Sequence, residues 1–261
     1  MENALLPFDE AQKRLRPFAS AHLGVRPIPV AQIVGTEGRG GDFDRSFKPR
    51  REGVRMRLRE VAQAFPHLDF PPIAAYKLGD AYFVLDGHHR VALARRRGTE
   101  WIDADVTELR AHWRLSATAD FVELLHAEQE RLFLHDSGLV EARPTVRIRF
   151  SRPSGYRELL EHVHVHGYRR VVEEGRTLPQ REVAGHWYEH AYLPALEAIE
   201  QEGLAAVCPH ATGADRVLYL HQRRRELSVD LGELELGEAA ARAAGERSKG
   251  HLRIKRVFRR G

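Results

Sequence analysis

The sequence predicts an α+β fold, in which a small mixed-sheet domain is followed by a mainly helical domain. In the first half of the chain, short apolar segments typical of strands alternate with amphipathic helical segments. From Thr118 onward, the apolar residues recur at helical spacing instead. The 261 residues, 43% of them hydrophobic, are enough for one large or two small domains with a core.

The elements of the mixed-sheet domain are expected within residues 23–112, after an N-terminal helical segment within residues 1–22. A helix over 51–65 is predicted because its apolar residues lie on one face. The Gly79-Asp80 dipeptide between two apolar segments predicts a β-hairpin. The expected elements are a helix over 8–16, strands over 30–34, 73–76, 82–85 and 102–107, a flexible glycine-rich loop over 35–41, and helices over 51–65 and from His88 up to Gly98.

The helical domain is expected over residues 113–235, with a helical extension and a basic tail over 236–261. The alternating segment 143–149 predicts a strand or hairpin arm. Pro194 predicts a kink or a break, because proline lacks the backbone N–H that a helix interior needs. The expected helices cover 119–134, 155–166, 179–201, 214–227 and 231–245.

Composition indicates a cytoplasmic protein. Cys208 is the single cysteine, so no intrachain disulfide forms, as is usual in a reducing compartment. No apolar run has the roughly 18–20 residues of a membrane span, and no signal peptide is expected. The formal charge of +4 is compatible with nucleic acid, nucleotide or acidic partners and does not select among them.

The most informative motif is Asp86-Gly87-His88-His89-Arg90, where an apolar strand meets a helix. Asp86 is expected to be the N-cap, and Gly98 the residue after the helix. The first turn of such a helix offers free N–H groups and the positive end of its dipole, beside the Arg90 guanidinium. Two histidines with ordinary pKa values near 6.5 add partial charge. The motif therefore predicts a phosphate or anion site.

Residues 27–109 resemble the ParB/sulfiredoxin-like superfamily. The resemblance rests on Pro72-Ile73 opening a strand, the Tyr82-Phe83-Val84 strand, the Asp86–Arg90 motif, Ala92 in the helix, Gly98 after it, and the closing strand 102–106. Partition proteins of this superfamily carry Gly-Glu-Arg-Arg at the motif, bind a cytidine nucleotide there and load onto DNA. Sulfiredoxins carry a catalytic cysteine where this chain has His88, so the resemblance does not extend to their chemistry.

The motif also resembles that of the free-serine kinase branch, which reads Asp-Gly-His-His-Arg as well. That resemblance implies a catalytic glutamate on the helix before the hairpin, and Glu52 stands in a similar place. Asp86 is the alternative base. Phosphoryl transfer usually needs Mg²⁺ in addition.

Three functions remain open from the sequence. The first is a nucleotide-binding protein, with phosphates on Gly87–Arg90, Arg39 in a loop over them, and CTP, ATP or ADP as ligand. The second is a small-molecule, serine-like kinase that uses ADP or ATP. The third is a protein-interaction module without a ligand. The helical half is expected to serve a partner, DNA or a homodimer, and the basic tail 248–261 is a candidate contact to the DNA backbone.

Several histidines in the helical half have spacings that could suit a metal. His186 and His190 are four residues apart, and His162, His164 and His166 alternate. Metal sites usually include a carboxylate or cysteine as well, and His162 and His166 would have to meet His186 and His190 in space. We interpret them as histidines packed at a helix interface and predict no metal site.

Overall fold

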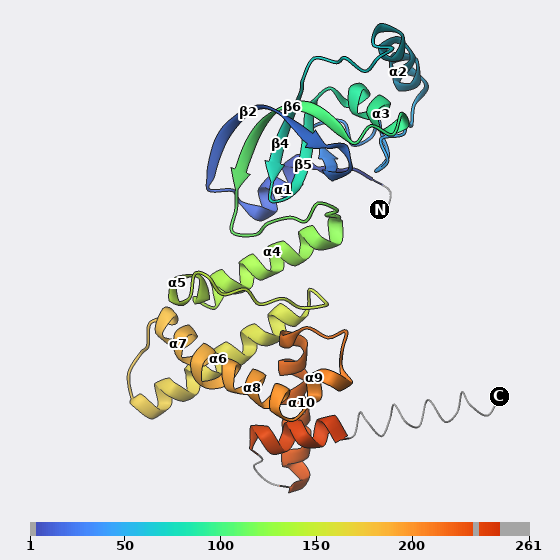
Figure 1. Ribbon diagram of the computed structural model, residues 1–261. Coiled ribbons are helices and arrows are strands. Elements are labelled where there is room, and N and C mark those ends of the chain that lie inside the picture. The colour runs from blue at the N-terminus through green and yellow to red at the C-terminus, as the bar shows by residue number, and fades with distance from the viewer. Residues whose placement is uncertain (1–3, 232–234, 246–261) are drawn as a thin grey trace, which may run out of the picture. The chain divides into compact units, whose positions relative to one another are not determined.

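The computed structural model describes residues 4–231 and 235–245, and it confirms the α+β class (Figure 1). The chain divides into two compact units, Met1–Arg131 and Leu132–Gly261. The sequence places the main boundary at 112/113, whereas the structure places it inside the helix α4, Phe121–Asp136. The basic tail 248–261 lies outside the described residues.

Unit 1 is built on a six-stranded mixed sheet with the order β1-β3-β5-β4-β6-β2. The predicted hairpin is confirmed: β4 pairs with β5 in antiparallel orientation, and Gly79 in its turn has φ +68°. β2 also pairs antiparallel with β6, whereas the β1–β3, β3–β5 and β4–β6 pairs are parallel. The strands are β1 Leu6–Pro7, β2 Ala19–Pro29, β3 Ile33–Thr36, β4 Ile73–Leu78, β5 Ala81–Asp86 and β6 Trp101–Arg110.

The long edge strand β2 has no counterpart in the sequence prediction. Most of its residues are exposed, and it contains Pro27, Pro29 and a register shift beside Gly24. Such an edge strand lacks the apolar alternation that identifies a half-buried strand. The strand predicted over 30–34 is displaced as well, because Val30–Gln32 form a 3₁₀ turn, η1, and β3 begins at Ile33.

Helices cover the sheet of unit 1 on two faces. Consecutive β5 residues point to opposite faces: Tyr82 and Val84 join a core with α2 (Glu52–Ala64) and α3 (His88–Arg96). Phe83 joins the other core with α1 (Phe8–Leu15) and the start of α4. Because α4 buries Leu124 and Ala127 in this second core, the sheet unit extends to Arg131 rather than ending at 112.

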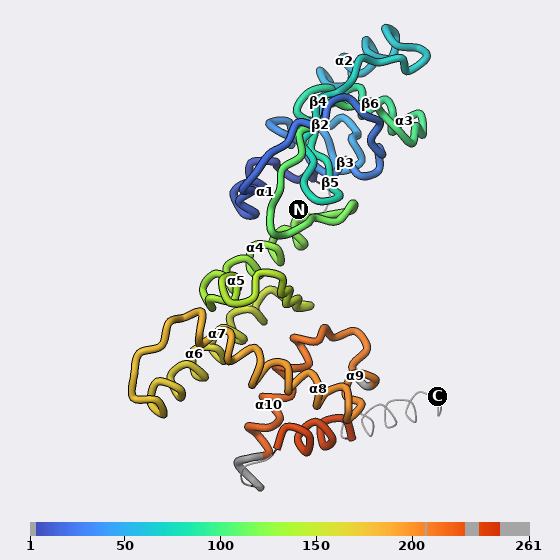
Figure 2. The backbone as a smooth tube through the Cα atoms, turned by 60° about the vertical axis from the view of Figure 1, so that its left-hand side comes forward, coloured from blue at the N-terminus to red at the C-terminus, as the bar shows by residue number. Residues whose placement is uncertain are grey.

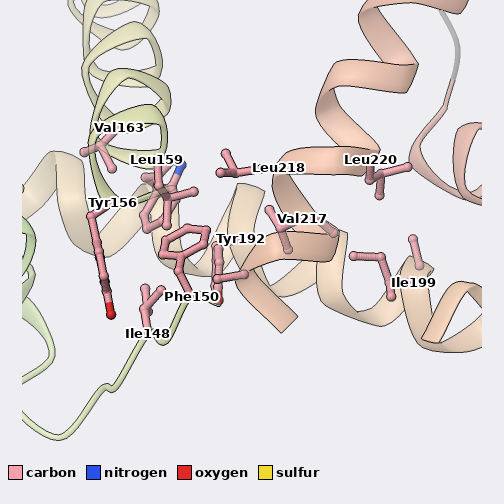
Figure 3. Packing of buried hydrophobic residues seen from close by; sticks show 14 of the residues in the cluster. Ile148, Phe150, Tyr156, Leu159, Val163, Tyr192, Ile199, Val217, Leu218 and Leu220 are labelled. Carbon is pink, nitrogen blue, oxygen red and sulfur yellow. The ribbon is translucent and has the colours of Figure 1, made fainter. Parts of the chain in front are cut away.

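Unit 2 is helical in its described part, and residues 143–149 form no strand. Its core includes Tyr156, Leu159, Val217 and Leu220 (Figure 3). Its helices beyond α4 are α5 Leu139–Ala142, α6 Gly155–Glu174, α7 Gln180–Trp187, α8 Leu193–Gln201, α9 Leu204–Val207, α10 Gly213–Leu231 and a helix over 236–245. None of the helices in the described residues is long and apolar enough to span a membrane.

The helix predicted over 179–201 continues past Pro194, since α7 leads directly into α8 (Figure 2). The two are joined by a π-helical segment, η2, at Tyr188–Tyr192. Pro194 has no N–H to donate to a carbonyl in the preceding turn, and a π segment is a known way to absorb such a mismatch within a helix. His190 and Ala191 of this segment line a cavity in unit 2.

Candidate functional site

The β5–α3 turn holds most of the predicted site residues, and Gly87 determines its backbone. Gly87 has φ +96°, which residues with a Cβ rarely adopt. A Cβ at this position would lie 2.5 Å from Ile73 Cγ2, so the close approach of β4 also requires glycine. Gly98 follows the helix with φ +71°, as predicted. The prediction of Asp86 as N-cap is wrong, because Gly87 is the N-cap and no side chain caps the helix.

Asp86 forms an ion pair instead. Its carboxylate accepts a hydrogen bond from Arg90 Nη2 at 2.6 Å. Arg90 Nη1 donates to the carbonyls of Pro71 at 2.6 Å and Pro72 at 2.9 Å. The Arg90 side chain, only 15% exposed, therefore fastens the first turn of α3 to the segment that leads into β4. This anchoring role is separate from the ligand contact that the sequence predicts.

His88 is buried and links α3 to β3. Its Nε2 lies 2.5 Å from Thr36 Oγ1, and its ring stacks against Phe43 with centroids 6.2 Å apart. Burial, reinforced by the nearby Arg39 charge, lowers the pKa of His88 to about 4. His88 is therefore neutral at pH 7, and the expectation that it contributes positive charge is wrong.

His89 lies edge-on to Phe43, with centroids 5.4 Å apart. Burial and then the Arg39 charge lower its pKa, so it is also a neutral imidazole near pH 7. Its Nε2 is buried and has no hydrogen-bond partner among the described residues. An unsatisfied buried nitrogen costs stability and is often retained where a ligand completes it.

These residues line one cavity of about 380 Å³. It contains Arg39 and all five residues from Asp86 to Arg90, which the sequence predicts as one site. It also contains Arg57 on α2, which the sequence reasoning missed. Arg57, Val61 and Phe65 lie four residues apart and share a helix face, and this spacing was the available signal.

Glu52 does not line this cavity. Its carboxylate is exposed and accepts a hydrogen bond from Arg55 at 2.8 Å. Arg57, the first residue of α2 that lines the cavity, follows Glu52 by five residues, about 7.5 Å along the helix axis at the usual rise. The structure therefore gives no geometric support to Glu52 as a base at this site.

The N-terminal end of α3 lines the cavity. The first helical hydrogen bond there runs from the Val91 N–H to the Gly87 carbonyl at 3.0 Å. The N–H groups of His88, His89 and Arg90 precede that bond and lack a carbonyl within the helix. Together with the dipole and the exposed guanidinium groups of Arg39 and Arg57, they can hold an anion.

The chain matches no protein-family model, and no curated protein matches it significantly. The candidate site therefore depends on its own geometry and on the motif. Among the described residues, no group of three or more histidine, cysteine or acidic side chains is placed to hold a metal ion.

A larger cavity of about 1020 Å³ lies at the other end of α3. Phe47, Leu58 and Trp101 line it, together with several arginines. One of them, Arg95, is committed to the structure, because it donates to the carbonyls of Val30 and Ile33. We place the phosphate site in the smaller cavity, because only that one combines the helix N-terminus with arginines from three separate segments.

Proposed function

We propose that unit 1 binds a phosphate-bearing ligand, a nucleotide, at the β5–α3 turn. One observation carries the proposal: Arg39, Arg57 and Arg90 converge with the N-terminus of α3 on one cavity. The Asp86 carboxylate also lines this cavity, and Arg90 offsets its charge. Arg39 and Arg57 are paired only at the surface, with Asp42 at 3.3 Å and Glu60 at 2.7 Å. Such exposed ion pairs contribute little and can be exchanged for a bound anion, which the backbone N–H groups would orient.

The cavity also has an apolar wall, which favours a nucleotide over a free inorganic ion. Val61, Phe65, Pro71 and Leu85 line it beside the arginines. Binding sites for small molecules combine such apolar surfaces with a few polar groups that fix orientation. The resemblance of residues 27–109 to the ParB/sulfiredoxin-like superfamily supports the same ligand class. Our proposal is binding, since no unpaired carboxylate lines the cavity among the described residues.

Calorimetric titration with CTP, ATP, ADP and pyrophosphate tests this function. Arg39→Ala and Arg57→Ala should each weaken the tightest of these ligands about 10- to 100-fold, because charge-assisted hydrogen bonds contribute about 1.5–3 kcal/mol. Both side chains are at least half exposed, so the melting temperature of the free protein should stay unchanged.

Arg59→Ala is the matched control. Arg59 lies on the same helix as Arg57 but lines the larger cavity, so its loss should leave the affinity unchanged. Equal affinity in wild type, Arg39→Ala and Arg57→Ala would contradict the proposal, as would the absence of binding by all four ligands.

A further inference from the structure

A third cavity, of about 410 Å³, lies in unit 2 between α6, η2 and α10. Four histidines line it: His162 and His166 from α6, His190 from η2 and His221 from α10. Arg169, Arg224 and Arg225 line it as well, and none of the described lining residues carries a carboxylate. The sequence separates these residues widely, and the helical packing brings them together.

The histidines contact one another rather than acidic partners. His166 Nε2 lies 2.9 Å from His186 Nδ1, and the His186 and His190 rings stack with centroids 4.0 Å apart. His162 and His221 meet edge to face at 4.9 Å. The histidines, each of which could carry a positive charge, are therefore packed in direct contact. The arginines that line the same cavity already make it electropositive.

Burial and these neighbours keep His162, His166 and His221 neutral. Burial, followed by the charge of His186 and Arg170, lowers the pKa of His166 to about 4. Burial, followed by His162 and Arg224, lowers the pKa of His221 to about 4. The pKa of His162 is lowered by burial and then by Arg225. A negative charge that binds beside these neutral histidines would raise their pKa values, so they can accept protons when an anion binds.

A transition-metal site does not fit this arrangement. The rings of His186 and His190 are nearly parallel, at 14°, so their nitrogens do not converge on one point. The closest nitrogen pair, between His166 and His186, is occupied by its own hydrogen bond. The described residues contain no group with metal-binding placement.

We propose that this cavity in unit 2 binds a multiply charged, phosphate-type anion, and that its histidines take up protons as the anion binds. Arg169 and Arg225 are exposed and have no carboxylate within salt-bridge distance among the described residues, so both are available to such a ligand. The proposal is independent of the nucleotide site in unit 1, since it uses different residues in a different unit.

The acidic groups that act on the cluster lie on the helices and do not line the cavity. Glu158 and Glu161 act on His162, whereas Glu174 and Glu189 act on His186. Arg170 opposes the protonation of both His166 and His186. The cationic side chains dominate at the cavity itself, so affinity for the anion should rise as the pH falls from 7.5 to 6.0.

The experiment is calorimetric titration of the full chain with pyrophosphate, in the Arg39→Ala/Arg57→Ala background that removes the unit 1 site. Repeating it at pH 7.0 in two buffers of different ionisation enthalpy, with pyrophosphate and with sulfate, which does not itself titrate near pH 7, measures the protons that the protein takes up. We expect net proton uptake and an affinity at least threefold higher at pH 6.0 than at pH 7.5. Adding Arg169→Ala/Arg225→Ala should weaken binding at least tenfold.

Arg157→Ala/Arg181→Ala removes the same charge from exposed positions of unit 2 outside the cavity and should bind like its parent. Histidine NMR signals provide a second readout, since those of His166 and His221 should titrate at higher pH with pyrophosphate present. Equal binding after Arg169→Ala/Arg225→Ala, absence of proton uptake, or binding of duplex DNA without binding of pyrophosphate would each overturn the proposal.

Discussion

The β5–α3 turn of unit 1 and the histidine cavity of unit 2 use the same residue types in different ways. In unit 1, His88 and His89 are neighbours in sequence, and each has a distinct place beside Phe43. In unit 2, the histidines come from three helices and contact one another. Burial keeps His88 in unit 1 and His221 in unit 2 neutral. The presence of histidines therefore does not determine the charge of either site, and arginines supply the positive charge at both.

The largest expected effect is on the backbone of the turn. Gly87→Ala should destabilise unit 1 by about 3 kcal/mol, because it combines a strained positive φ with a Cβ at 2.5 Å from Ile73. Urea unfolding followed by circular dichroism measures the change. Gly98→Ala is the control, since Gly98 has φ +71° but open space around it, and it should cost about 1 kcal/mol. If Gly87→Ala and Gly98→Ala lower the free energy of unfolding equally, close packing around Gly87 does not contribute to the stability of the turn.

Acidification should affect the cavity of unit 2 strongly. The pKa of His221 is about 4 in the folded chain and near 6.5 when unfolded, so the unfolded state binds the proton first as the pH falls. The stability that neutral His221 contributes is therefore complete above pH 6.5 and is lost between pH 6.5 and 4. This predicts a loss of about 2 kcal/mol by pH 5.

Hydrogen exchange of α10 at pH 7 and pH 5, corrected for the intrinsic rate, measures this loss. The same sign applies to His88 in unit 1, where a single histidine has a pKa near 4. Unit 2 contains two such histidines, His166 and His221, and should therefore open first. His221→Gln should reduce the pH dependence of α10, and an unchanged pH profile would show that the cluster is not the acid-sensitive part.

The two regions also differ in how far the sequence could predict them. The turn was predictable because Asp86–Arg90 are contiguous in the sequence. Their position between an apolar strand and a helical segment places them at a helix N-terminus. Their ionisation was not predictable, because the neutrality of His88 depends on Phe43 and on burial by segments distant in sequence. The unit 2 cavity requires the packing of α6 against α10, which helical spacing alone does not specify.

The same distinction explains the errors in the fold. Strands that alternate in polarity or follow a turn signal, such as β4 and β5, are present as predicted. β2 escaped prediction because an exposed edge strand with two prolines has little hydrophobic pattern. Glu52 was linked to the site by a motif resemblance, but in the structure its exposed carboxylate pairs with Arg55 and does not line the cavity.

The smallest of these effects on stability is expected for Arg90, and it sharpens the contrast between an anchoring arginine and a ligand-binding one. Arg90→Ala removes hydrogen bonds to Pro71, Pro72 and Asp86. We expect a loss of about 1–2 kcal/mol in the free energy of unfolding, since charged hydrogen bonds that are partly exposed contribute in this range. Arg97→Ala, on an exposed side chain at the end of α3, should change stability by less than about 0.5 kcal/mol. Thermal and urea unfolding without ligand would measure both changes. If the Arg90→Ala protein is as stable as the Arg97→Ala protein, Arg90 does not anchor the turn, and only the ligand-binding role remains.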